Sequence, residues 1–540
     1  MRRLTCVPVA AALVLACAAS ARAQDPAALE QERKADEARP ILELSLDETV
    51  KRAMDNNLDI KVDSYNPKAS AESVRAAQGY YDPFLSSILN KNSQTSPQSN
   101  AFSGAQEVTT KGYTWDFGLG QAVPTGGSFG LSFNNNKSDT NSVFSTFNPS
   151  YNSGLTLSAV QPLFQNLRMD APRRQILVSK KNAEISDIQF RQTVVNVLAI
   201  VKAQYYELLF AIDNLDAARK SLALAQKLLN ENQIKVRVGT MAPLDVVQAQ
   251  SEVAGREEGV IVAENDLREA EDTLKRSIFP GNDPAMWDLR IVPIDRPTAE
   301  PFPVDVEAAT QRALSSRTDV VASRKNLERT DIDVRYAKSL TLPQVDLVGS
   351  YGGIGIGGTQ LIRDSLGGPV VGTIPGGYGD ATSAVFANDF PNWRIGFNLS
   401  YPILNRSAKA ASAQAQLARE QVETSLKRLE LTVASEVRTA ARAVNTNLKR
   451  VESSRAARTL QEQRLDAEEK KFAAGMSTNF FVTQAQRDLA QAEVNEVRAI
   501  ADYRKSLVTF ERVQEAGIGT GNGSATFSVT TSGGSRVSLQ

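Results

Sequence analysis

The chain has 540 residues, with 61 Lys and Arg against 61 Asp and Glu, no histidine and two cysteines. The lack of histidine excludes Ser-His-Asp and Cys-His catalysis and the common zinc-ligand sets, and the balanced charge gives no sign of a nucleic-acid partner. A carboxylate-only enzyme stays open, but no motif supports one. We therefore predict a protein that is not an enzyme, with no catalytic, cofactor-binding or metal-binding residues.

Residues 1–23 have the features of a secretory signal peptide. Arg2 and Arg3 precede an uncharged, mostly apolar stretch, and Ala21 and Ala23 fit a small-x-small cleavage site. A membrane anchor is one alternative. A lipoprotein is another, because residues 14–17 partly resemble a lipobox, and the sequence does not decide whether Cys17 is lipidated.

Both cysteines, Cys6 and Cys17, lie within this segment, so the exported chain carries no disulfide. Loss of the three arginines up to residue 23 leaves 58 basic against 61 acidic residues, a net charge of −3. We find no later apolar run long enough for a transmembrane helix. A chain of this kind that spans a membrane has to do so as a closed β-barrel.

The first half of the exported chain changes character several times. Tyr113, Trp115 and Phe117 alternate with polar or glycine residues, the period of a strand with one apolar face. In chain order we predict a flexible segment at 24–43, helices from 44 to 79, strands within 84–161, and a long helical hairpin at 170–277. Its first helix, from 170 to 238, would be about 100 Å long.

The second half predicts the same order of elements. A short helix at 304–315 is followed by strands within 344–402, which a Gly/Pro-rich loop at 357–392 interrupts, and by a helical hairpin at 407–514. We therefore divide the chain into a first repeat at 44–300 and a second at 301–515. The Gly/Ser/Thr-rich tail at 516–540 is predicted to be disordered.

Matching positions confirm an internal duplication. The segment Lys235–Gln250 reappears as Lys471–Gln486 at an offset of 236 residues, and in each copy it joins a very long helical stretch to a shorter one. Pro83 to Pro162 spans 79 residues, whereas Pro343 to Pro402 spans 59. The excess of 20 residues predicts one additional hairpin, near 113–134, in the first repeat.

Two interpretations of these elements compete. The shorter helices carry heptad seams flanked by small residues, which an ordinary coiled coil would explain, as in a soluble periplasmic scaffold or chaperone. That interpretation leaves the aromatic-rich strands unexplained, because their period and composition are those of an outer-membrane barrel. Candidates for the aromatic girdle are Tyr113, Trp115, Trp393 and Tyr401, each of which could instead belong to the core of a soluble sandwich. With four to six strands per chain, a barrel with a usable lumen needs several chains.

The order of these features resembles the TolC family of outer-membrane efflux channels. The residues that carry the resemblance are Gln204–Leu215 in the first long helix, Gln161–Phe164 and Tyr401–Leu404 after the strands, and the turns at Gly239 and Gly475. The resemblance extends over residues 44–515.

The resemblance implies an α+β membrane protein in the outer membrane of a Gram-negative bacterium. A homotrimer with two repeats per chain and two strands per repeat would form a twelve-stranded barrel that continues into a long periplasmic α-helical coiled-coil tunnel. It would passively conduct drugs, metal ions or secreted protein from an inner-membrane pump and a periplasmic adaptor. The substrate, the pump class and the place of the extra hairpin, inside or outside the barrel, stay open.

The resemblance also implies two kinds of site at the turns. The adaptor would dock on the tips formed by Val238, Gly239, Thr240 and Met241 and by Ala474, Gly475, Met476 and Ser477, although both glycines could simply permit a tight turn. Well-known family members carry two aspartates, three residues apart, at the closed entrance, and here those positions are Phe481 and Gln484. The first-repeat counterpart of Phe481 is Asp245. We therefore expect an aromatic constriction at Phe481 in place of a cation-binding gate.

Overall fold

The structure is a computed structural model that describes residues 39–97, 105–281, 284–296, 298–515, 527–530 and 536–539. The predicted signal peptide at 1–23 and most of the predicted flexible segment lie outside the described residues. The chain divides into two compact units. Unit 1 comprises residues 1–62, 193–313 and 433–540, and unit 2 comprises residues 63–192 and 314–432.

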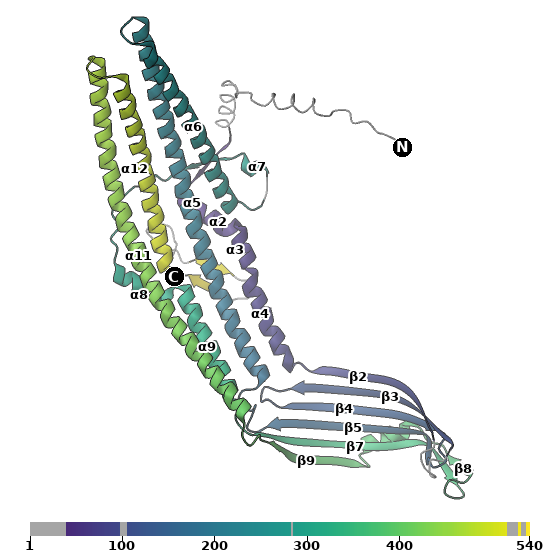
Figure 1. Ribbon diagram of the computed structural model, residues 1–540. Helices are drawn as coiled ribbons and strands as arrows, with labels where there is room; N and C mark the ends of the chain where they lie inside the picture. The colour runs from purple at the N-terminus through teal and green to yellow at the C-terminus, as the bar shows by residue number, and fades with distance from the viewer. Residues whose placement is uncertain are drawn as a thin grey trace, which may run out of the picture. The chain divides into compact units, whose positions relative to one another are not determined.

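Unit 2 contains a seven-stranded antiparallel sheet (Figure 1). The strand order is β2-β3-β4-β5-β7-β8. Strand β9 also pairs with β7, along the same edge as β8 but at the N-terminal end of β7. The strands are β2 (Phe84–Pro97), β3 (Glu107–Ala122), β4 (Ser128–Thr140), β5 (Phe147–Pro162), β7 (Gln344–Arg363), β8 (Val370–Ile374) and β9 (Pro391–Ser400). Six long strands therefore lie side by side, and β8 is a short addition.

The register of these strands gives the sheet one apolar and one polar face. Leu119 pairs with Leu131, which pairs with Leu157, and all three side chains lie on the apolar face. One residue along, Gly118 pairs with Ser132, on the polar face. This separation follows from the period-two alternation of the sequence.

The sheet corrects two expectations. The first repeat supplies four long strands, so the implied plan of two strands per repeat is wrong for this chain. The extra hairpin is β3–β4, and it is hydrogen-bonded into the sheet between β2 and β5. The predicted loop at 357–392 also contains structure, namely the end of β7, β8 and helix α10 (Tyr378–Ala387).

Unit 2 also contains helices and a 3-10 turn, some of which are joined by ion pairs. They are α4 (Tyr65–Gln78), the 3-10 turn η1 (Gly79–Tyr81), α9 (Thr318–Ser339), and the first parts of α5 (Ala171–Arg237) and α11 (Arg406–Ala473). Arg174 of α5 lies 2.6 Å from Asp333 of α9, and Arg419 of α11 lies 2.7 Å from Asp331 on the same helix. The charged helix α9 thus bonds to both long helices.

Unit 1 holds the remainder of α5 and α11 with their return helices, α6 (Pro243–Ile278) and α12 (Asn479–Gln514). It also contains α2 (Leu46–Asn56), α3 (Leu58–Asp63), α7 (Pro284–Trp287), α8 (Val306–Ser316) and the parallel pair β1 (Ile41–Leu44) and β6 (Arg290–Pro293). The fully buried Tyr205 hydroxyl donates to the Leu44 carbonyl at 3.2 Å. Burial raises the pKa of Tyr205, which keeps this phenol protonated as a donor.

The long helical hairpins agree with the sequence to within one or two residues, because their periodic pattern extends over many turns. Three short strands lie where no strand is predicted. β1 lies at the end of the segment predicted to be flexible, and the tail predicted to be disordered includes the antiparallel pair β10 (Phe527–Thr530) and β11 (Arg536–Leu539).

Helix α5 also qualifies the expectation that no later helix is apolar enough to cross a membrane. By length and composition alone it is such a helix. Its residues Val201, Tyr205 and Leu208 are almost fully buried within unit 1. We therefore interpret this stretch as the core helix of unit 1.

Candidate functional site: the hairpin turns and the sheet

The two helical hairpins of unit 1 end in the same backbone motif. Thr240 N–H donates to the Lys235 carbonyl at 2.9 Å, and Gly239 N–H donates to that of Val236 at 3.0 Å. This is a Schellman motif, in which a residue of left-handed conformation ends the helix. The φ angle of Gly239 is 83°, and no heavy atom lies within 4 Å of the position a Cβ would take.

The second turn repeats this geometry. Met476 N–H donates to the Lys471 carbonyl at 2.8 Å, and Gly475 N–H donates to the Phe472 carbonyl at 3.2 Å. The φ angle of Gly475 is 75°. Glycine is therefore needed at both positions because the backbone is left-handed there, and not because a side chain would collide with its neighbours. The repeated sequence segment encodes a repeated local structure.

Apolar side chains are exposed at both turns. Val238 is 66% exposed and Met476 is 75% exposed. Of the other predicted tip residues, Gly239, Thr240, Ala474 and Gly475 are exposed, while Met241 and Ser477 are half-buried. Such side chains at the end of a polar hairpin form a small surface suited to contact with another protein.

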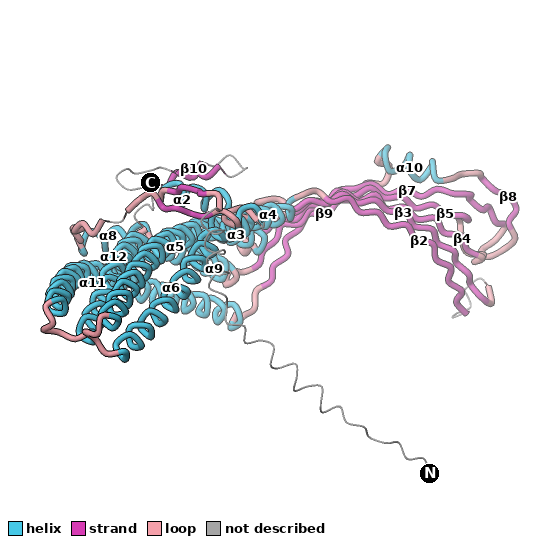
Figure 2. Tube along the Cα trace, turned by 90° about the horizontal axis from the view of Figure 1, so that it is seen from above, coloured by secondary structure: helices cyan, strands magenta, loops and turns pink. Residues whose placement is uncertain are grey.

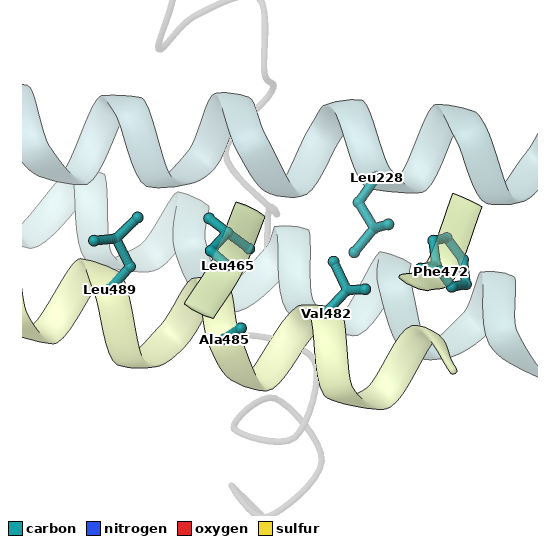
Figure 3. Close-up of a cluster of buried hydrophobic side chains, with 6 residues drawn as sticks. All are labelled: Leu228, Leu465, Phe472, Val482, Ala485 and Leu489. Atoms are coloured by element: carbon teal, nitrogen blue, oxygen red, sulfur yellow. The ribbon is translucent and has the colours of Figure 1, made fainter. Parts of the chain in front are cut away.

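Close to the turns, the two hairpins pack against each other through a small hydrophobic cluster (Figure 3). The cluster joins α5, α11 and α12, and the half-buried Met241 packs against it. Its buried members are Leu228, Leu465, Phe472, Val482, Ala485 and Leu489. Lys235 lies 3.5 Å above the Phe472 ring, which adds a cation–π contact between the hairpins.

Two polar links accompany this cluster. The side-chain amide of Asn232 donates to that of Asn479 at 2.8 Å, and both residues are buried. Further along, Arg487 of α12 donates to Glu252 of α6, with Nε at 2.9 Å from Oε2. Burial raises the pKa of Glu252, but Arg487 and Arg256 lower it by more, so this pKa lies below its ordinary value.

The predicted gate residues lie in the first turns of the return helices. Asp245 is half-buried at the start of α6, and Phe481 is 52% exposed at the start of α12. The Phe481 ring packs edge-on against that of Phe480 at 5.5 Å. Gln484 donates to Asp488 at 2.8 Å, which places an acidic group one turn beyond the predicted gate.

The predicted girdle residues lie on the apolar side of the sheet or at its end. Trp393 pairs with Tyr351 and is 69% exposed, and Tyr401 follows β9. Eight residues of strand separate Trp393 from Tyr401, which is about 26 Å along the strand. At the tilt of about 40° that is typical of outer-membrane strands, this is about 20 Å of height, somewhat less than the apolar band of about 25 Å. The ring of Tyr113 lies beneath Lys91 and Lys137, at 5.2 and 5.7 Å.

Trp115 differs from the other girdle candidates because helix α10 covers it. Figure 2 shows α10 on one face of the sheet beside β7. Tyr378 of α10 stacks edge-on with Trp115 at 5.2 Å and donates to the buried side chain of Asn135 at 2.9 Å. The Ser153 hydroxyl donates to the same amide oxygen at 2.9 Å. The helix thus shields two polar residues on an otherwise apolar face.

Glycines in β7 allow α10 to approach this closely. A Cβ on Gly355 would lie 2.0 Å from the Ala381 carbonyl oxygen, and one on Gly357 would lie 2.4 Å from that of Gly377. In the structure both glycines belong to β7, which continues to Arg363, although Gly357 begins the Gly/Pro-rich stretch predicted as a loop. Their alternate spacing is the signal that indicates a strand approached by other backbone.

The described residues contain no group of three or more His, Cys, Asp or Glu side chains that could hold a metal ion. Sequence reasoning located the two turns and proposed the girdle candidates, but it missed the Asn232–Asn479 and Glu252–Arg487 links. Both links join segments more than 230 residues apart, and no local pattern marks them.

A two-faced antiparallel sheet whose strands are followed in each repeat by a very long helical hairpin defines an α+β class of protein built from two repeats. The outer membrane efflux protein family matches residues 126–278 and 309–513, more than half of the chain. The chain belongs to this family, whose members are outer-membrane channels and not enzymes. It is thus a transport protein of the Gram-negative outer membrane with a periplasmic helical portion.

Individual proteins support the same assignment. Outer membrane protein TolC of Vibrio cholerae is 24% identical over 331 residues, covering 61% of this chain and 70% of that protein. The solved outer-membrane channel OprN has a TM-score of 0.63 at 15% identity and covers 89% of this chain and 95% of its own. The CmeC outer membrane channel of Campylobacter jejuni has a TM-score of 0.61 at 15% identity, with 87% and 85% covered. At these identities the solved structures show a shared fold.

Proposed function

We propose that three copies of this chain form a closed outer-membrane barrel and a periplasmic helical tunnel. The assembly passively conducts substrate from an inner-membrane pump and a periplasmic adaptor to the outside. The observation that carries the proposal is the two-faced sheet, whose strands lead into two hairpins with matching turns. The apolar face suits lipid and the polar face suits an aqueous lumen.

Fractionation of cells tests this proposal. We expect the protein in the outer-membrane fraction, as trimers that resist detergent and dissociate on heating. Full recovery as a soluble periplasmic protein would favour the scaffold or chaperone and contradict the channel.

The two turns are the proposed docking surface for the adaptor. Support comes from their equal backbone geometry and from the exposed Val238 and Met476. Met476→Glu would place a charge in this apolar contact, and we expect it to weaken adaptor binding by at least tenfold, or about 1.4 kcal/mol. Leu460→Glu is the matched control, because Leu460 is similarly exposed (64%) but lies away from the turn on α11. Equal binding by both variants would refute docking at the turns.

The start of the return helices is the proposed gate. With one phenylalanine per chain, a trimer would place three Phe481 rings at one level of the tunnel, next to Asp245 of the other hairpin. Phe481→Ala should raise the closed-state conductance in single-channel recordings, and Phe480→Ala serves as the neighbouring aromatic control. An unchanged closed-state conductance in Phe481→Ala would exclude an aromatic constriction.

The cargo is proposed only as a class that such a duct can pass, namely drugs, metal ions or secreted protein. Deletion of the gene followed by toxin-susceptibility and secretion profiling would distinguish these classes.

A further inference from the structure

We infer that the β3–β4 hairpin belongs to the barrel wall, so that three copies form an eighteen-stranded barrel with a wide, nearly uncharged lumen. This inference rests on the proposed trimer. Its first support is the pairing itself, because β3 and β4 are bonded along their length between β2 and β5. Leaving the hairpin out would require all those bonds to break and β2 to pair with β5.

The edges of the sheet fit a second copy of this chain. Neighbouring strands are antiparallel throughout, so six strands bring β9 of one copy antiparallel to β2 of the next. Both edge strands are exposed along nearly their whole length. An open edge cannot face lipid, which makes closure by the neighbouring copy necessary in a membrane.

The stagger of the sheet fits the tilt of a barrel. Phe84, the first residue of β2, is connected by successive strand pairs through Ser158 to Arg394 in β9. Strand β9 ends six residues later, at Ser400. If the strand ends that adjoin the helices are level, the sheet shifts by six residues over six strands. Six strands are separated by five spacings, so with about 3.3 Å per residue and 4.8 Å between strands the tilt is about 40°, within the range of outer-membrane barrels.

Eighteen strands at this tilt give a backbone diameter of about 36 Å, against about 24 Å for twelve. The cross-section is about twice as large. The lumen would be lined mainly by small and amide side chains, since the polar face carries Thr114, Ser132, Asn134, Asn136, Asn152 and Thr156. Ile88, Ile354 and Ile356 are apolar exceptions on the same face. A hollow of about 650 Å³ lies on this face.

The charge of this face indicates the cargo. By register, the charged residues that the six long strands place on it are Asp116, Asp346 and Arg394, a net charge of −1 per chain. Such a wall neither attracts nor repels ions strongly, and its amides and hydroxyls bond to polar solutes. The geometry thus suits large, uncharged, hydrophilic cargo better than metal ions.

Paired cysteines test the wall directly, because the exported chain contains no native thiol once the signal peptide is removed. Ser132→Cys with Thr156→Cys joins neighbours β4 and β5 and should form a disulfide in the outer membrane. Ser86→Cys with Thr156→Cys should not, because three strand spacings, about 14 Å, separate them in an eighteen-stranded wall. Ser86→Cys with Asn398→Cys should cross-link β2 of one copy to β9 of the next and yield covalent trimers. Gly396→Cys or Ser400→Cys replaces Asn398→Cys to test the neighbouring registers.

The three cysteine pairs distinguish a failure of the eighteen-stranded wall from a failure of the trimeric channel. Covalent trimers together with a Ser86–Thr156 bridge would show twelve strands, which overturns this inference and leaves the channel intact. No covalent trimer at any register would overturn the closed trimer as well. A second measurement is the size of neutral polyethylene glycols that enter the reconstituted channel from its outer mouth. The largest polymer that enters should have about 1.5 times the radius of the largest polymer that a twelve-stranded barrel admits. Exclusion at the twelve-strand limit would contradict the wide lumen.

Discussion

The buried amide pair between the two hairpins should control how readily the turns separate. Asn232 is fully buried and Asn479 is 3% exposed, and their side chains are bonded at 2.8 Å. Asn479→Ala removes one partner and leaves a buried amide donor unpaired. This costs about 1–3 kcal/mol, which corresponds to about a 5- to 150-fold rise in the population of locally opened hairpins.

Hydrogen exchange of the first turns of α12 measures this population. Asn230→Ala is the matched control, because Asn230 lies on the same helix as Asn232 but is exposed. The double variant Asn232→Ala with Asn479→Ala should cost less than the sum of the single variants, since neither partner is then left alone. Equal exchange in Asn479→Ala and Asn230→Ala would refute the role assigned to the pair.

Three other predictions concern the packing around the same elements. Phe472→Ala empties part of the buried cluster and should destabilise the protein by about 3–5 kcal/mol, whereas Phe480→Ala, at an exposed ring, should stay within about 0.5 kcal/mol in denaturant unfolding. The lowered pKa of Glu252 means that its bond to Arg487 is intact above the ordinary value of 4.5 and is lost as pH falls through the lower folded value. Hydrogen exchange near the turns should therefore rise below about pH 4.5. Arg487→Gln should reduce that rise, because only Arg256 then lowers the pKa of Glu252. Gly355→Val places a side chain against the backbone of α10, so limited proteolysis should cleave α10 faster than in the native protein, and unchanged cleavage would contradict the close packing.

The long helices and their turns could be predicted from sequence because their signals are local and repeated. A 67-residue helix such as α5 shows its period many times, and Gly239 and Gly475 stand where each pattern stops. The alternation of strands was equally clear in β3, where aromatic residues alternate with small and polar ones. These features agree with the structure almost to the residue.

The remaining features depend on contacts distant in sequence. The hairpin near 113–134 was predicted from spacing, but its place in the sheet is set by the pairing of β2 with β3 and of β4 with β5. The strand content of β7 beyond Gly357 was obscured because glycines that admit α10 resemble those of a loop. The strand pair β1–β6 was missed because four residues are too few to show a period.

We propose that this chain is the outer-membrane duct of an export system. The most direct test of this proposal is a strain that lacks the gene and is complemented by the native chain or by Met476→Glu, with cellular accumulation of exported compounds as the readout. We expect that deletion raises accumulation of at least one class of compound, that the native chain restores export, and that the docking variant does not. Unchanged accumulation of every class after deletion, with the native protein in the soluble periplasmic fraction, would contradict it.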